Sequence, residues 1–217
     1  MKKRIFLTAA VAVLSSALLA ACSSGGKNAN QPVTYTYVFS SDPATLDYTV
    51  SGNSSTKQVT GNVIDGLLEN DQYGNLVPSV AEDWSVSKDG LTYTYKIRKG
   101  IKWYTNEGEE YGEVKAQDFV TGLKHAVAKK SQALYLVQDS IKGLDDYING
   151  KTNDFSTVGI KATDDYTLVY TLNNPESFWN SKTTMGVLAP INEDFLASKG
   201  DDFGKPTDVT SILYNGP

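Results

Sequence analysis

The single cysteine of the chain closes the sequence Leu-Ala-Ala-Cys at residues 19–22. It follows a short basic head and an apolar run from residue 5 to residue 19, the arrangement of a secretory signal. When a cysteine stands at the cut point, its thiol takes a diacylglyceryl group. The cysteine then becomes the first residue of the mature chain. The pattern therefore predicts a signal peptide at residues 1–21 and a lipid anchor on Cys22.

Two other interpretations of this stretch stay open. An ordinary secreted protein could carry a coincidental cysteine here, and a transmembrane anchor would use the apolar run as its span. The run is short for that purpose, because a membrane helix needs about 20 apolar residues. Residues 22–31 are small and polar, with Lys27 as the one charged residue, and are expected to form a flexible tether. The chain is thus expected to be lipid-anchored on the extracellular face of the cell membrane.

Beyond Cys22, the sequence predicts no catalytic residue, no metal ligands and no cofactor. The single histidine, His125, has no cysteine partner and no close acidic cluster, so we expect it at a surface or half-buried helix position rather than in a zinc site. The sequence contains neither a Gly-x-Ser-x-Gly motif nor a phosphate-cradling glycine loop. An enzyme is therefore not expected. Four acidic pairs lie at expected turns or helix starts, where solvation explains them: Glu109-Glu110, Asp145-Asp146, Asp164-Asp165 and Asp201-Asp202.

Composition restricts the partners of the mature chain. Loss of three basic residues with the signal peptide leaves 17 of the 20 basic residues against 25 acidic ones, a net charge of −8. An acidic surface argues against nucleic acid and anionic lipid headgroups as partners. With Cys22 acylated, no thiol remains for a disulfide, so stability must come from a packed core.

Hydrophobic periodicity predicts strands and helices in irregular alternation, which indicates a mixed α/β (α+β) fold. The clearest unit is a hairpin of residues 84–87 and 91–98, because Asp89-Gly90 supplies the positive φ of a tight turn. Trp84 and Trp103 are expected to anchor its core. The other expected elements are a strand at 33–39, helices at 56–68, 117–129, 133–140, 144–149, 177–181 and 193–198, a turn at 71–75, and paired strands at 158–162 and 167–172.

Short motifs in a fixed order carry a family resemblance. Each is weak alone, but their order and spacing together are specific. The motifs are SDPATLD (41–47), GLLE (66–69), GNLVP (74–78), AEDW (81–84), KDGLTYTY (88–95), RKGIKW (98–103), VKAQDF (114–119), DDYTL (164–168) and YNGP (214–217). The chain resembles the extracellular oligopeptide-binding lipoproteins of ABC importers, the dipeptide/oligopeptide solute-binding family, in its Gram-positive branch.

The resemblance implies a two-lobed clamp that closes over an extended peptide. Oligopeptides are then the ligands, and an ABC permease with its ATPase subunits is the membrane partner. The resemblance places the loop at residues 51–55 in the cleft, where small residues would let a peptide backbone approach closely. A flexible turn before the next helix is the alternative. The implied ligand-binding residues are Gly52, Asn53, Ser54, Ser55, Gln132 and Tyr135.

Family members are much longer than this chain, so the resemblance also implies an incomplete solute-binding domain at residues 32–217. Residues 32–50 and about 165–217 are expected in the first-lobe sheet, and about 51–164 in an inserted hairpin subdomain. The second lobe is expected to be missing. A truncated peptide-binding lipoprotein is therefore the first expectation, and a non-transporting surface lipoprotein, either an interaction module or the remnant of an interrupted gene, is the alternative.

Overall fold

The computed structural model describes Thr36, Val38 and residues 41–216. Contacts divide the chain into residues 1–38 and residues 39–217, and every helix and strand described lies in the second unit. Thr36 and Val38 are exposed and have no regular structure. The rest of the strand predicted at 33–39 lies outside the described residues, as do the expected signal peptide, Cys22 and the tether.

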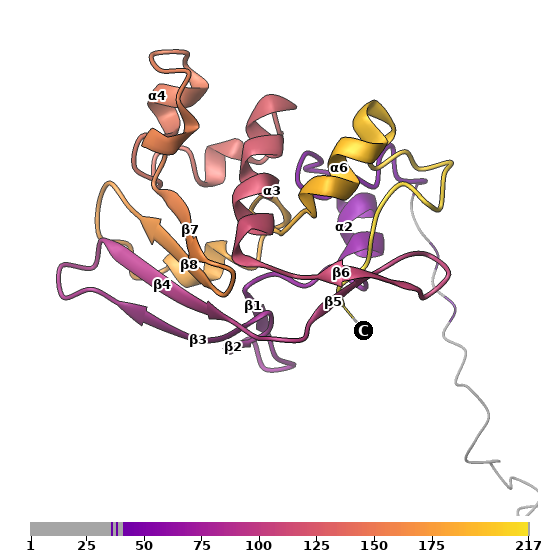
Figure 1. The fold of residues 1–217 in the computed structure, drawn as a ribbon, viewed down its shortest axis with the longest axis horizontal. Helices are drawn as coiled ribbons and strands as arrows, with labels where there is room; N and C mark the ends of the chain where they lie inside the picture. The colour runs from indigo at the N-terminus through magenta and orange to yellow at the C-terminus, as the bar shows by residue number, and fades with distance from the viewer. Residues whose placement is uncertain (1–35, 37, 39–40, 217) are drawn as a thin grey trace, which may run out of the picture. The chain divides into compact units, whose positions relative to one another are not determined.

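A four-stranded antiparallel sheet organises the second unit (Figure 1). Its order is β3 (Ala81–Val86), β4 (Thr92–Ile97), β8 (Thr167–Thr171) and β7 (Ile160–Asp164). Both predicted hairpins are confirmed, and Gly90 has the positive φ, 72°, that the first turn requires. Sequence reasoning did not foresee the pairing of β4 with β8, which joins the two hairpins into one sheet.

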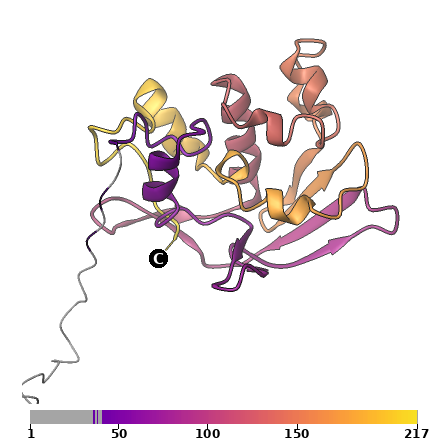
Figure 2. The same ribbon diagram turned by 180° about the vertical axis from the view of Figure 1, so that it is seen from behind.

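Helices cover the face of this sheet that carries its buried side chains. Helix α3 (Ala116–Ala128) packs against β7 and β8, and the predicted helix at 117–129 is confirmed. Figure 2 shows the short α5 (Trp179–Lys182), in orange, on the same side of the sheet. The remaining helical segments are α4 (Leu144–Ile148), α6 (Glu193–Lys199) and the single 3-10 turns η1 (Leu134–Leu136), η2 (Phe155–Thr157), η3 (Gly186–Leu188) and η4 (Gly200–Asp202).

The helix predicted at 56–68 is wrong in its second half. Helix α2 spans Ser54–Thr60 and ends at Gly61, whose N–H bonds the carbonyls of Lys57 and Val59. Beyond it, Val63 and Ile64 are half-buried in a turn and the residue after it, and Leu67 and Leu68 are buried where the chain enters β1 (Leu68–Asn70). Strand β1 pairs with β2 (Leu76–Pro78) across the predicted turn at 71–75. The helix predicted at 133–140 is likewise reduced to the three residues of η1.

Aromatic side chains fill the space between the sheet and α5. The Trp179 ring lies 5.1 Å from the Tyr170 ring, which also makes an edge contact with Tyr95. Trp103 is fully buried on β5 (Lys102–Tyr104), which pairs with β6 (Glu110–Glu113). Trp84 is half-buried against the same core, so both tryptophans pack as expected.

The sequence predicted a boundary near residue 164, between the inserted subdomain and the later part of the first lobe. Strands of the four-stranded sheet come from both sides of it. A division there would cut the β7–β8 hairpin, and residues 39–217 form one compact unit by contacts. The structure therefore supports no subdomain boundary at that point. The assignment of residues 32–50 and 165–217 to a first lobe stays a prediction, whereas the mixed α/β class is confirmed.

Asp118, at the start of α3, should make stability depend on pH. Its carboxylate accepts hydrogen bonds from Trp103 Nε1 at 2.8 Å and the Lys115 N–H at 3.1 Å, but burial outweighs both and raises the pKa of Asp118 to about 6. The folded state therefore holds this proton more tightly than the unfolded state, whose pKa is near 3.8. The free energy of unfolding should fall as pH rises from about 3.8 to about 6 because of this group. Urea titrations across this range should show a shallower fall for Asp118→Asn, and an unchanged slope would contradict the assignment.

Candidate functional site

The loop that contains Gly52 is fixed at its start by Asp47. One carboxylate oxygen of Asp47 accepts from the backbone N–H of Thr49 at 3.1 Å and from its hydroxyl at 2.8 Å. The other oxygen lies 2.7 Å from Nε2 of His125 on α3. Because a carboxylate can only accept, Nε2–H is the donor. The loop is thereby tied to the helix that packs on the sheet.

The surface or half-buried position expected for His125 is wrong. The residue is only 7% exposed, and the Phe203 ring contacts its imidazole edge-on at 5.3 Å. Its partner Asp47 is equally buried and lies 78 positions earlier in the chain. Because of that separation, no local pattern in the sequence indicates an acidic neighbour for His125.

The turn after α3 packs directly against this loop. Ser131 Oγ donates to the Thr49 carbonyl at 2.6 Å, and the Gln132 N–H donates to the Val50 carbonyl at 3.0 Å. In return, the Gly52 N–H donates to Gln132 Oε1 at 3.0 Å. A side chain at position 52 would place Cβ only 3.2 Å from that oxygen, so glycine allows the close approach. The structure thus joins two predicted site residues that lie 80 positions apart.

The other predicted site residues differ in exposure. Asn53 caps α2 by accepting from the Ser55 N–H and, like Ser54, is exposed. Ser55 is 1% exposed and its hydroxyl donates to Asn53 Oδ1, and its role in ligand binding stays a prediction. Tyr135 on η1 is 72% exposed, and within residues 41–216 no hydrogen bond joins it to the loop.

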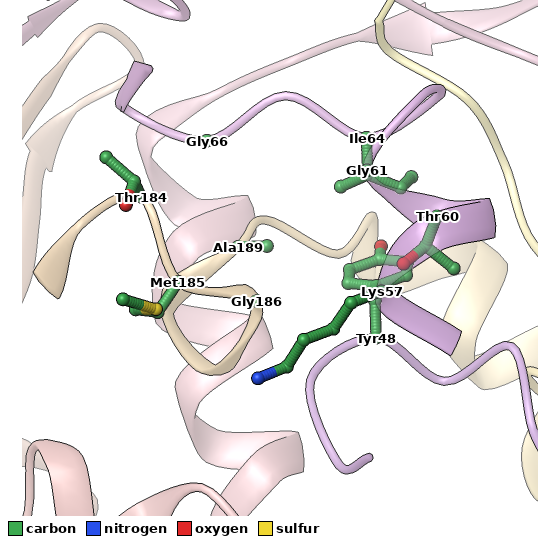
Figure 3. Close-up of a pocket in the computed structure, with 10 residues that line it drawn as sticks. All are labelled: Tyr48, Lys57, Thr60, Gly61, Ile64, Gly66, Thr184, Met185, Gly186 and Ala189. Atoms are coloured by element: carbon green, nitrogen blue, oxygen red, sulfur yellow. The ribbon is translucent and has the colours of Figure 1, made fainter. Parts of the chain in front are cut away.

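A small pocket that sequence reasoning missed lies between α2 and η3 (Figure 3). Its volume is about 180 Å³. Gly186 forms part of its floor, where a Cβ would stand 2.4 Å from the Tyr48 carbonyl oxygen. Burial, with the nearby charges of Asp47 and Asp118, raises the pKa of Tyr48 well above its usual value, and its hydroxyl donates to the Pro190 carbonyl at 2.8 Å. The lining residues are Tyr48, Lys57, Thr60, Gly61, Ile64, Gly66, Thr184, Met185, Gly186 and Ala189.

Among residues 41–216, no group of three or more His, Cys, Asp or Glu side chains is placed to hold a metal ion. Nor does any helix in the described part of the chain have the length and apolar character needed to cross a membrane.

Known proteins resemble this chain in sequence and fold. Residues 75–217 match the model of a protein family described as bacterial extracellular solute-binding proteins, family 5 Middle. The oligopeptide-binding protein AliA of Streptococcus pneumoniae is 64% identical over 99% of this chain, and a dipeptide-binding protein of Lactococcus lactis is 32% identical over 95% of it. The structure of Listeria monocytogenes OppA bound to peptide superposes on 80% of this chain with a TM-score of 0.73 and 32% identity.

The chain spans about a third of the length of these proteins: 32% of AliA, 36% of the Lactococcus protein and 33% of the Listeria OppA chain. The family match itself covers well over half of the 217 residues, and the resemblance found in the sequence motifs is thereby confirmed. The chain belongs to the bacterial extracellular solute-binding proteins of family 5.

Proposed function

We propose that the protein binds oligopeptides outside the cytoplasm, held to the membrane by lipid on Cys22, and passes them to an ABC permease driven by its ATPase subunits. The family match and the relatives named as oligopeptide-binding proteins support this function. The Leu-Ala-Ala-Cys sequence at residues 19–22 supports the anchor. The chain spans about a third of the length of its relatives. Peptide binding and delivery by the whole protein are therefore stated as a proposal.

The juxtaposition of Gly52 and Gln132 is the observation that carries the proposal. Asp47 and Ser131 hold the loop from two sides, so that its exposed backbone is ordered before a ligand arrives. Ordering in advance reduces the entropy lost on binding. Backbone hydrogen bonds to a peptide contribute about 0.5–1.5 kcal/mol each and are independent of the peptide's side chains. Such a surface suits oligopeptides of varied sequence.

Peptide titration of the full 217-residue chain in detergent tests this function. Contacts from one side only should give weak binding, with a Kd of about 1 mM. The amide resonances of Gly52 and Gln132 should shift with saturable dependence on peptide concentration. Gly52→Val should weaken binding at least about fivefold, a change of about 1 kcal/mol, because its side chain displaces Gln132.

Gly112→Val is the matched control for this titration. Position 112 lies in β6, and an added Cβ there meets no atom within 4 Å. Its peptide affinity should equal that of the parent chain. Equal peptide affinities of Gly52→Val and the parent would contradict the assignment of the Gly52 loop to peptide binding. Absence of saturable binding at about 10 mM peptide would contradict peptide binding by these 217 residues alone.

A further inference from the structure

A second pocket, which we call the hairpin pocket, lies between the β5–β6 hairpin and α6 and has a volume of about 250 Å³. Figure 1 shows these two elements side by side. The lining of the hairpin pocket shares no residue with the loop at residues 51–55 or the segment at residues 132–135. The peptide contacts proposed above therefore leave this pocket unused.

The walls of the hairpin pocket are apolar and aromatic. Phe195, Ile212 and Leu213 line it and are buried. Tyr111 on β6 also lines it and is 41% exposed. Its ring stands at 86° to the ring of Phe195, with the two centroids 5.4 Å apart. Apolar side chains accommodate an alkyl chain, and the face of an aromatic ring attracts a cation.

Two glutamates and one lysine are the charged residues of the lining. Glu107 and Glu109 lie at the tip of the hairpin, where the backbone N–H of each donates to Thr105 Oγ1 at 3.3 Å. Both are exposed, and within residues 41–216 neither has an ion-pair partner, whereas Glu110 lies 4.0 Å from Lys102. Two unpaired carboxylates therefore stand on the solvent side of the pocket.

The lysine of the lining is already engaged with one wall. Lys199 Nζ lies 5.5 Å from the centroid of the Phe195 ring and donates to Thr210 Oγ1 at 2.9 Å. Tyr111 is thus the aromatic wall that holds no cation among the described residues. Because two carboxylates face one ammonium, the lining has a net charge of −1 and attracts a further cation.

The size of the hairpin pocket limits the cation to one small group. A cavity of about 150 Å³ accommodates a benzene ring, whereas whole drug-sized ligands occupy about 300–1,000 Å³. At about 250 Å³, the pocket lies between these limits. A guanidinium suits its walls better than an ammonium does. It is planar and less strongly hydrated, it stacks on aromatic rings, and it binds carboxylates through two N–H groups.

We propose that the hairpin pocket binds an alkylguanidinium group. The planar cation lies against the Tyr111 ring and donates to the carboxylates of Glu107 and Glu109. Its alkyl chain packs against Ile212 and Leu213. This site goes beyond the peptide binding proposed for residues 51–55 and 132–135. The same group occurs in free small guanidines and in the arginine side chains of polypeptides, and the experiment distinguishes these two sources.

Three small probes test the chemistry of the pocket. The full chain is titrated with butylguanidinium, butylammonium and the neutral planar analogue butylurea, while the methyl resonances of Ile212 and Leu213 are followed by NMR. Butylguanidinium should bind at least about tenfold more tightly than butylurea, because only the cation gains from the ring and the carboxylates. It should bind about threefold more tightly than butylammonium, whose charge is more strongly hydrated.

Variants assign the preference for a cation to the glutamates. Glu107→Gln combined with Glu109→Gln should remove the tenfold preference for butylguanidinium over butylurea. Glu69→Gln combined with Glu82→Gln is the matched control, because it removes two exposed glutamates outside the pocket and should leave the preference unchanged. Lys199→Met removes the competing ammonium and should tighten butylguanidinium binding about twofold.

A second pair of variants assigns the aromatic wall. Tyr111→Leu keeps an apolar side chain and should weaken butylguanidinium binding about threefold, because the ring face is lost. Tyr73→Leu is its control, since Tyr73 is an exposed tyrosine in the turn between β1 and β2, outside the pocket. Equal affinities of Tyr111→Leu and the parent chain would overturn the placement of the cation on this ring.

A fourth probe, Nα-acetylarginine N-methylamide, distinguishes the two sources of the group. Binding as tight as that of butylguanidinium would support the site and assign it to an arginine side chain in a polypeptide. Weaker binding than that of butylguanidinium would support the site and assign it to a free guanidine. Equal binding of butylguanidinium and butylurea, a preference unchanged in the Glu107 and Glu109 variant, or no methyl shift at about 50 mM butylguanidinium would each overturn the site.

Discussion

Gly122→Ala should destabilise the fold by about 3 kcal/mol, although alanine is favoured over glycine in a helix interior by about 1 kcal/mol. Gly122 lies in α3 where the helix meets the chain after η3, and an added Cβ would stand 2.1 Å from the Ala189 carbonyl oxygen. Because that neighbour is backbone, it cannot rotate away. The Ile191 N–H also bonds the Asp118 carbonyl of α3 at 2.9 Å, which holds the two segments together.

Urea denaturation of Gly122→Ala and Gly112→Ala measures this effect against a matched control. Position 112 has no atom within 4 Å of an added Cβ, so Gly112→Ala should leave the free energy of unfolding unchanged or raise it by up to about 1 kcal/mol. If Gly122→Ala proves as stable as the parent chain, the close packing of α3 on residue 189 is contradicted.

Asp47→Ala should cost about 3 kcal/mol, because it removes the acceptor for three buried donors at once. They are the His125 Nε2–H, the Thr49 N–H and the Thr49 hydroxyl. A buried donor that loses its acceptor costs about 1–3 kcal/mol, and partial repacking around Asp47→Ala reduces the sum for the three donors. The start of the Gly52 loop should also become mobile, with faster hydrogen exchange at Thr49.

Two variants separate this effect from a general loss of acidic charge. Asp47→Asn keeps an acceptor for Thr49 and should cost only about 1 kcal/mol. Asp201→Ala breaks an exposed pair with Lys129 and should change stability by less than about 1 kcal/mol. Equal stabilities of Asp47→Ala and Asp201→Ala in urea would show that the Asp47–His125 contact contributes nothing to the fold.

Local pattern was enough to predict the elements whose signals are local. Alternating residues and an Asp-Gly turn predicted the β3–β4 hairpin, and helical spacing predicted α3 to within a residue. Pattern misled at Ile64 and Leu67, which have helical spacing with Val59 but lie beyond the end of the helix at Gly61, Ile64 half-buried and Leu67 buried. Apolar spacing reports which residues are buried, and a short segment can meet it in more than one conformation.

Long-range pairings could not be predicted because no local feature records them. Gly52 and Gln132 were selected by family resemblance, and only the fold joins them by a hydrogen bond. Asp47 and His125 gave no sign of their contact. Lys57 reads in sequence as an ordinary solvated helix residue, and its place at the rim of a pocket depends on the distant turn at residues 184–186.

Photo-cross-linking of a peptide to the full chain tests the central claim most directly. A short peptide with a photoreactive side chain is irradiated with the protein, with and without excess unlabelled peptide, and the attachment sites are identified by mass spectrometry. The peptide-binding account predicts sites that competitor suppresses, located in the loop at residues 51–55 and the segment at residues 132–135. Sites confined to other surfaces, such as the β1–β2 hairpin, or labelling that competitor does not reduce, would contradict it.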